Sequence, residues 1–281
     1  MLTVKAPAKL NLTLEVLGKR PDGFHEIRSV IQAIDLCDTL FFSAGEGISF
    51  TCDMEGWSTE KSLVTNTAKL LQEVTGCKKG AAVRIEKRIP LMAGLGGDSS
   101  DAAAVLRGLN ELWDLNIPPP ELQELAAELG SDAPFFIRGG TALAGGRGES
   151  LTPLPSPSKR WVVLVMPDIS VAPGKTGRLY TGLNKGHFTD GKVTDELVRA
   201  LHKGDKVVPS LLFNTFENIA FDYFPGLRVY KEHLIKLGAP YVHLAGAGPS
   251  LFTLCDDKSG AEELFTRCEN QGMKVYLAET L

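Results

Sequence analysis

The sequence predicts an α+β protein with two domains. Runs with a strand pattern and runs with helical spacing follow one another along the whole chain of 281 residues. Since about 150 residues per domain is usual, this length suits two modest domains. Residues 151–159 contain three prolines and form the best candidate for a boundary. We therefore expect one domain over residues 1–155 and a second over residues 156–281.

Alternating apolar and polar residues predict the strands of the first half. Leu10, Leu12 and Leu14 alternate with Asn11 and Thr13, which is typical of a strand with one buried face. Strands are expected at 8–16, 29–36, 39–43, 48–52, 81–86, 133–137 and 141–144. Apolar residues at helical spacing predict helices at 62–75, 99–113 and 118–128.

The second half shows the same mixture. Residues 161–166 are an unbroken apolar run of the kind found in a buried strand. Further strands are expected at 241–244, 251–254 and 274–277, and helices at 193–202, 227–237 and 260–270.

Composition and charge exclude several classes of protein. Lys and Arg total 30 against 34 Asp and Glu, so the chain lacks the basic excess of a general nucleic-acid binder. The longest apolar run is far shorter than the roughly 18 residues of a membrane helix, and no apolar signal-peptide core follows Met1. The five cysteines form no CxxC pair, which favours reduced thiols over a metal or disulfide site. We expect a cytoplasmic protein with neither nucleic-acid nor membrane partners.

The strongest local signal is the glycine-rich segment 90–101, Pro-Leu-Met-Ala-Gly-Leu-Gly-Gly-Asp-Ser-Ser-Asp, directly before an alanine-rich helix. Unpaired N–H groups at a helix start, together with glycines that lack a Cβ, form a cradle for an anion. The same residues also fit a tight turn in which Asp98 or Ser99 caps the helix. Glycine richness alone leaves both interpretations open.

Other nucleotide-binding motifs fail on their spacing. A dinucleotide fingerprint that starts at Gly94 would need glycine at position 99, which is Ser99. The tripeptide Gly174-Lys175-Thr176 suggests a P-loop, but the required first glycine falls on Ile169. GxSxG and HExxH are also absent from the sequence.

Three segments in the right order resemble the motifs of the GHMP small-molecule kinases. They are residues 6–12 (APAKLNL), 90–101 and 245–250 (AGAGPS). Residues 18–25 (GKRPDGFH) and 129–136 (LGSDAPFF) are more specific, and they resemble the family members that act on 4-diphosphocytidyl-2-C-methyl-D-erythritol.

That resemblance implies a reaction and a fold. The reaction is transfer of the γ-phosphoryl group of ATP to the 2-hydroxyl of this cytidine diphosphate compound, in non-mevalonate isoprenoid biosynthesis. The fold is two-lobed, with an amino-terminal lobe like ribosomal protein S5 domain 2 and a ferredoxin-like carboxy-terminal lobe. The partner it implies is a small molecule with a cytidine diphosphate group, and the co-substrate is ATP with Mg²⁺.

The resemblance implies that Lys9 and Asp132 are the catalytic pair. Asp132 would accept the proton of the attacking hydroxyl, and Lys9 would lower the pKa of that hydroxyl and offset charge on the phosphoryl group. Sequence physics alone leaves an alternative, in which Lys9 is a solvated strand residue and Asp132 caps a turn before Pro134.

The remaining site residues follow from the same motifs. Asn11 would position the substrate, while Phe24 and His25 would hold the cytosine by stacking and polar contacts. Mg²⁺ is expected to come with ATP and without direct protein ligands, and Ser99 or Ser100 is the alternative if the protein does contact the ion. The residues expected to surround ATP are Pro90, Leu91, Met92, Ala93, Gly94, Leu95, Gly96, Gly97, Asp98, Ser99 and Ser100.

Some positions depart from the family pattern and leave alternatives open. Ser62 stands where the family usually has Asn, at a position associated with adenine, and residues 169–188 match poorly, so either Tyr180 or Phe188 is a candidate aromatic wall for the cytidine. A sister kinase for homoserine, mevalonate or a sugar remains an alternative, as does a nucleotide-binding relative without catalysis.

Overall fold

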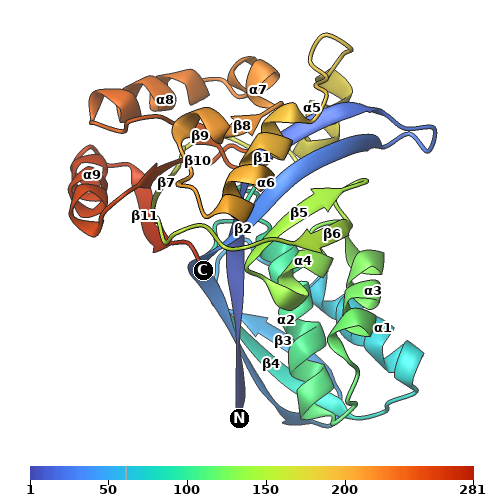
Figure 1. The fold of residues 1–281 in the computed structure, drawn as a ribbon. Helices are drawn as coiled ribbons and strands as arrows, with labels where there is room; N and C mark the ends of the chain where they lie inside the picture. The colour runs from blue at the N-terminus through green and yellow to red at the C-terminus, as the bar shows by residue number, and fades with distance from the viewer. Residues whose placement is uncertain (61) are drawn as a thin grey trace. The chain divides into compact units, whose positions relative to one another are not determined.

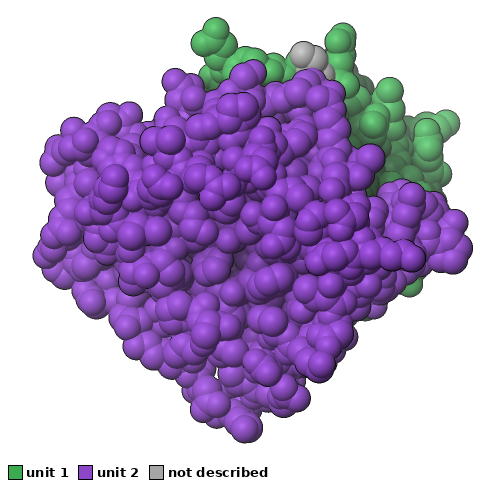
Figure 2. All heavy atoms as spheres, turned by 90° about the horizontal axis from the view of Figure 1, so that it is seen from above, with its two compact units in different colours: residues 1–8, 37–91, 96–139 green, residues 9–36, 92–95, 140–281 purple. Residues whose placement is uncertain are grey.

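The computed structural model describes residues 1–60 and 62–281, and its fold is α+β as predicted. The chain forms two compact units that interleave along the sequence (Figure 2). Unit 1 comprises residues 1–8, 37–91 and 96–139, and unit 2 comprises residues 9–36, 92–95 and 140–281. The expected boundary near residue 155 falls within unit 2 and stays a prediction.

Figure 1 labels the elements along the chain. The strands are β1 (Leu2–Lys19), β2 (His25–Gly45), β3 (Ile48–Cys52), β4 (Gly80–Glu86), β5 (Thr141–Gly145), β6 (Ser150–Pro153), β7 (Trp161–Met166), β8 (Phe213–Asn214), β9 (His243–Leu244), β10 (Leu251–Cys255) and β11 (Lys274–Glu279). The helices are α1 (Val64–Thr75), α2 (Gly97–Leu112), α3 (Pro119–Leu129), α4 (Ala133–Arg138), α5 (Lys175–Gly182), α6 (Lys192–Lys203), the 3₁₀ turn η1 (Pro209–Leu211), α7 (Glu217–Tyr223), α8 (Leu227–Lys236) and α9 (Lys258–Asn270).

Unit 1 packs helices α1 to α4 together with a sheet in which β4 lies between β3 and β2. The β3 strand runs parallel to β4, and β4 runs antiparallel to the second half of β2. Helix α2 packs closely because its buried face is built from small residues. A Cβ at Gly108 would lie 2.4 Å from the Phe42 ring, so a glycine is needed for this approach.

The sequence interpretation of unit 1 is wrong at one element. Residues 133–137 form a helix, α4, instead of the expected strand. All five are buried, so the segment lacks the apolar–polar periodicity that separates a helix from a strand. Pro134 in the first turn and Gly139 after the last turn, with φ 68°, fit a short helix. The two runs expected at 29–36 and 39–43 form a single strand, β2.

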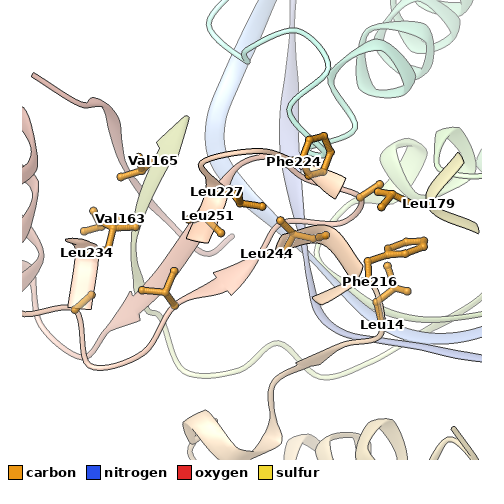
Figure 3. Packing of buried hydrophobic residues seen from close by; sticks show 14 of the residues in the cluster. Leu14, Val163, Val165, Leu179, Phe216, Phe224, Leu227, Leu234, Leu244 and Leu251 are labelled. Carbon is orange, nitrogen blue, oxygen red and sulfur yellow. The ribbon is translucent and has the colours of Figure 1, made fainter. Parts of the chain in front are cut away.

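Unit 2 contains an antiparallel sheet of order β11-β7-β10-β9. Along the chain its strands and helices follow the β-α-β-β-α-β order of a ferredoxin-like fold. Helix α9 packs on β7, β10 and β11. The core beneath contains large apolar side chains from this sheet, from α5, α7 and α8, and from β1, ten of which Figure 3 labels.

Unit 2 also contains the second part of β1 and the first part of β2, on either side of the turn that connects these two long strands. There, β2 pairs antiparallel with β5, and β1 pairs parallel with β8. Five short elements escape the sequence analysis: β6, β8, α5, α7 and the 3₁₀ turn η1. Over residues 1–60 and 62–281, no helix is long and apolar enough to span a membrane.

Candidate active site

Lys9 and Asn11 lie side by side on β1 within unit 2. Both are buried, with exposed fractions of 5% and 4%. The Lys9 Nζ donates to Asn11 Oδ1 at 2.8 Å, and the Asn11 Nδ2 donates to the Ser29 Oγ at 2.8 Å. The Ser29 hydroxyl in turn donates to the Thr13 carbonyl at 2.5 Å. The Lys9 side chain is therefore buried and fixed by its hydrogen bond to Asn11. The alternative of a solvated strand lysine is wrong.

Two glycine loops pack against Lys9 within unit 2. The Lys9 backbone N–H donates to the Leu95 carbonyl at 3.0 Å. At Gly94, where φ is 85°, a Cβ would lie 2.1 Å from the Ala245 carbonyl oxygen. At Gly246, where φ is 54°, a Cβ would lie 2.6 Å from the Gly94 carbonyl oxygen and 3.3 Å from the Lys9 Nζ. Both loops need glycine for their backbone conformation and for their close contact.

Gly94→Ala is therefore expected to lower the free energy of unfolding by about 1–3 kcal/mol, the usual cost of overpacking a filled site. Its added methyl group meets backbone, which cannot turn away as a flexible side chain would. Gly145→Ala is the matched control, because a Cβ there meets nothing within 4 Å. Urea unfolding of both variants checks this, and equal midpoints would show that the loops separate freely.

The expected ATP segment is divided between the units. Residues 90–91 and 96–100 belong to unit 1, and residues 92–95 belong to unit 2. In unit 2, Met92 has φ 53° and is exposed, whereas Ala93 and Leu95 are buried and hold the segment in place. The residues of this segment that begin helix α2 belong to unit 1.

Gly96 is the N-cap of α2, with φ 73°. Asp98 and Ser99 lie inside the first turn, so the alternative in which either caps the helix is wrong. In the described chain no side chain caps this end of α2. Its first N–H groups and the positive end of the helix dipole are thus available to an anion.

The Asp98 carboxylate links the starts of two helices in unit 1. It accepts a hydrogen bond from the Ser62 Oγ at 2.6 Å and from the Leu63 N–H at 3.3 Å. Ser62 is one of the residues that depart from the family pattern, and here it is bonded to the glycine-rich segment. Asp98 therefore orders the segment through its side chain.

The two candidate metal-contacting serines differ. Ser100 is fully buried and its Oγ donates to the Pro7 carbonyl at 2.6 Å. Ser99 is half-buried, and its Oγ lies 3.9 Å from the position of a Cβ on Gly130. Ser99 thus lies near the turn that carries Asp132, and unlike Ser100 it is partly exposed.

Asp132 is half-buried at the N-cap position of α4, two residues after Gly130. The Ala133 N–H donates to the Gly130 carbonyl at 3.2 Å, which closes the turn. In the described residues the Asp132 carboxylate makes no capping hydrogen bond with α4. Asp132 thus occupies the capping position that the alternative interpretation gave it, but its side chain does not cap the helix.

His25 lies in an aromatic cluster of unit 2, and Phe24 lies elsewhere. The His25 ring stacks on Tyr180 at 4.9 Å between centroids with 19° between planes, and meets the edge of Phe188 at 6.0 Å. The exposed Phe24 ring instead lies 4.8 Å from the Arg147 guanidinium. Burial, reinforced by the charge of Lys19, lowers the pKa of His25. Its imidazole is therefore mainly neutral at pH 7.

A buried ion cluster that no sequence pattern indicated joins the end of the glycine-rich segment to its surroundings in unit 1. The Lys87 Nζ lies 2.5 Å from an Asp38 oxygen and 2.6 Å from an Asp101 oxygen, with all three side chains at 2% exposure or less. Burial, opposed by Lys87 and assisted by Asp38, raises the pKa of Asp101 to about 8. Burial opposes the charge of Lys87 too, but the two carboxylates raise its pKa overall. No sequence pattern pairs these residues, because Asp38 lies on β2, Lys87 directly after β4 and Asp101 on α2.

Lys175 is a second buried lysine that the sequence patterns did not indicate. It begins α5, and only 7% of its surface is exposed. The Lys175 Nζ donates to the Ala247 carbonyl at 3.4 Å. Burial, with the charge of Lys9, lowers its pKa to about 7. In the sequence, Lys175 stood out only through the Gly174-Lys175-Thr176 tripeptide. The spacing of the surrounding residues excludes a P-loop there.

Comparison with known proteins matches both halves of the chain to one family. Residues 62–140 match the GHMP kinases N terminal domain, and residues 196–274 match the GHMP kinases C terminal domain. Crystal structures of homoserine kinase from Cytophaga hutchinsonii and of L. major mevalonate kinase share the fold at 17% and 16% identity, with TM-scores of 0.71 and 0.74.

More specific relatives cover nearly the whole chain. A 4-diphosphocytidyl-2-C-methyl-D-erythritol kinase of Dehalococcoides mccartyi is 48% identical over 281 residues, covering 100% of this chain and 99% of that protein. The enzyme of the same name from Geobacillus kaustophilus is 40% identical, covering 94% and 91%. A crystal structure of 4-(cytidine 5'-diphospho)-2C-methyl-D-erythritol kinase matches with a TM-score of 0.84 at 30% identity, covering 99% of each chain. The chain thus belongs to the GHMP kinases, in the family of the 4-diphosphocytidyl-2-C-methyl-D-erythritol kinases.

Proposed function

We propose that this kinase transfers the γ-phosphoryl group of ATP to the 2-hydroxyl of 4-diphosphocytidyl-2-C-methyl-D-erythritol, giving the 2-phosphate and ADP. The observation that carries the proposal is the 48% identity over the full chain to a kinase named for this substrate. ATP is the co-substrate, as it is for the GHMP kinases. The product would serve isoprenoid biosynthesis by the non-mevalonate pathway.

Lys9 and Asn11 would act on the reacting hydroxyl. Their hydrogen bond and the bond from Asn11 to Ser29 fix both side chains, so little reorganisation is needed when substrate binds. The buried Lys9 ammonium would stabilise the developing alkoxide and the charge on the phosphoryl group. Asp132 would accept the proton of the hydroxyl.

The start of α2 would receive the phosphates of ATP. Its uncapped first turn and the glycines before it support this assignment. Mg²⁺ suits this place, because the ion binds oxygen ligands and keeps phosphate oxygens around it, and the partly exposed Ser99 hydroxyl would join them. When bound, Mg²⁺ would neutralise charge on the transferring phosphoryl group.

His25 and Tyr180 would hold the cytosine, with Phe188 beside them. A neutral imidazole and a phenol ring offer both a stacking surface and polar edges to a base. The contact of His25 with both aromatic residues supports their joint assignment. Phe24 would contribute from the exposed turn, next to Arg147.

We also propose that the kinase acts in the cytoplasm, on a small-molecule substrate carrying a cytidine diphosphate group. The five cysteines are free thiols in the structure, as a reducing compartment maintains them. The overall negative charge fits a small-molecule enzyme better than a nucleic-acid binder.

ADP release tests the proposed substrate. With ATP and Mg²⁺, turnover is expected on 4-diphosphocytidyl-2-C-methyl-D-erythritol and not on homoserine or mevalonate tested in parallel. Turnover on another alcohol alone would keep the kinase and overturn the substrate. ATP binding without turnover on any of the three would support the non-catalytic alternative.

A further inference from the structure

Lys175 and Lys9 place two buried ammonium groups on the same glycine loop of unit 2. The Lys175 Nζ bonds to the carbonyl of Ala247, and the position of a Cβ on Gly246 lies 3.3 Å from the Lys9 Nζ. The loop itself, residues 245–250, has no ionisable side chain. Burial, together with the like charge of Lys9, therefore makes the charged form of Lys175 costly to the folded protein.

Lys87 shows how this chain otherwise stabilises a buried lysine. It is held between two carboxylates, at 2.5 and 2.6 Å. Lys175 has no such carboxylate among residues 1–60 and 62–281, and its hydrogen bond to Ala247 is long at 3.4 Å. Glu217 on α7, the helix that packs on α5, is engaged by His243 and Lys231. A buried cation left in this state is typical of a site that takes its negative charge from a ligand.

The position of Lys175 on helix α5 indicates which part of a ligand could supply this negative charge. Five residues after Lys175, the same helix carries Tyr180, which stacks on His25. Five residues of α-helix rise about 7.5 Å. One short helix thus carries Tyr180, which contacts His25, and Lys175, which contacts the loop next to Lys9. In the proposed substrate, a diphosphate connects the cytidine to the methylerythritol.

We propose that Lys175 binds the diphosphate group of the cytidine-linked substrate. This inference rests on the proposed function and adds to it a residue that no GHMP motif contains. The ammonium donates to phosphate oxygens, and the bound diphosphate supplies the negative charge that Lys175 lacks among the protein's side chains.

The test compares Lys175→Met with wild type and with Lys185→Met, a nearby exposed lysine that serves as the control. Losing a hydrogen bond to a charged group is expected to raise the KM for 4-diphosphocytidyl-2-C-methyl-D-erythritol by about 10–100-fold, with a small change in kcat. The KM for ATP stays unchanged, since the lost contact is to the other substrate. Lys175→Arg is expected to retain most of the affinity.

A second readout separates binding from a structural role. Because burial disfavours its charge, Lys175→Met is expected to raise the urea midpoint of the ligand-free kinase at pH 7, whereas a structural lysine would lower it. Cytidine diphosphate, titrated by calorimetry, is expected to bind Lys175→Met at least about tenfold more weakly than wild type.

Each outcome decides a separate point. An unchanged KM for the cytidine substrate, or a raised KM for ATP alone, would overturn the assignment while wild-type turnover upholds the proposed function. A wild type that does not turn over this substrate would overturn the proposed function itself. Should Lys175→Met fail to fold, Lys175→Gln provides the same comparison, and a fall in stability in both would show a structural role.

Discussion

Replacing Lys9 with alanine is expected to lower kcat by at least about 10²-fold, the lower range for a residue that takes part in proton transfer and charge stabilisation. Lys9 is 5% exposed and its ammonium is fixed by Asn11, so its charge acts in a place where water screens it little. Water that enters the vacated space cannot restore a fixed positive charge. The loss should therefore appear in kcat more than in KM.

Asp132→Ala is the companion variant and is expected to lower kcat by a similar factor. Lys274→Ala, at an exposed position on β11, is the control and should retain wild-type rates. Steady-state kinetics with saturating ATP measures all three variants. Near-wild-type rates in both Lys9→Ala and Asp132→Ala would remove this mechanism.

Lys87→Met is expected to lower the free energy of unfolding by about 3–5 kcal/mol, because it leaves the buried Asp38 carboxylate and the Asp101 carboxyl group without their cation. Asp38 retains hydrogen bonds from the Arg88 and Ile89 N–H groups, at 2.6 and 2.8 Å, but no positive charge. Lys69→Met on the exposed face of α1 is the control. Urea unfolding measures both, and equal midpoints would contradict the account of the cluster.

The same cluster predicts a pH dependence. The folded pKa of Asp101, about 8, is above its ordinary value of 3.8, so the folded state holds a proton that the unfolded state releases. The stability from this carboxyl is complete below about pH 4 and is lost as the pH rises through about 8. Asp101→Asn should remove this part of the dependence between pH 5 and 8. If wild type and variant lose stability in parallel over that range, Asp101 is not protonated in the folded protein.

The sequence predicted most of the elements that have a distinct apolar pattern, and the motifs that are local. Helix α2, strand β3 and strand β7 lie where their sequence patterns place them. The apolar residues of each follow the spacing that its final burial requires. Helix α4 was mistaken for a strand because every residue from 133 to 137 is buried. The short α5 escaped because its sequence, with two glycines, has weak helical propensity and is held by packing on α7.

Within the candidate site, sequence could name residues in contiguous motifs but not those that tertiary packing adds. Lys9 and Asn11 share a strand face by their spacing alone. The pairing of His25 with Tyr180 crosses 155 positions of sequence, and the Asp38–Lys87–Asp101 cluster joins three separate segments of the chain. The burial of Lys175 arises from the loop at Ala247, which no local pattern connects to it.

Phosphorus NMR of the reaction product tests the central claim most directly. The kinase is incubated with ATP, Mg²⁺ and 4-diphosphocytidyl-2-C-methyl-D-erythritol, and the spectrum is recorded as ADP forms. We expect a new phosphomonoester signal coupled to the carbon that bears the 2-hydroxyl, in equal amount to ADP, with the diphosphate signals of the substrate intact. ADP formed without a new phosphomonoester, or a phosphoryl group on any other position of the substrate, would contradict it.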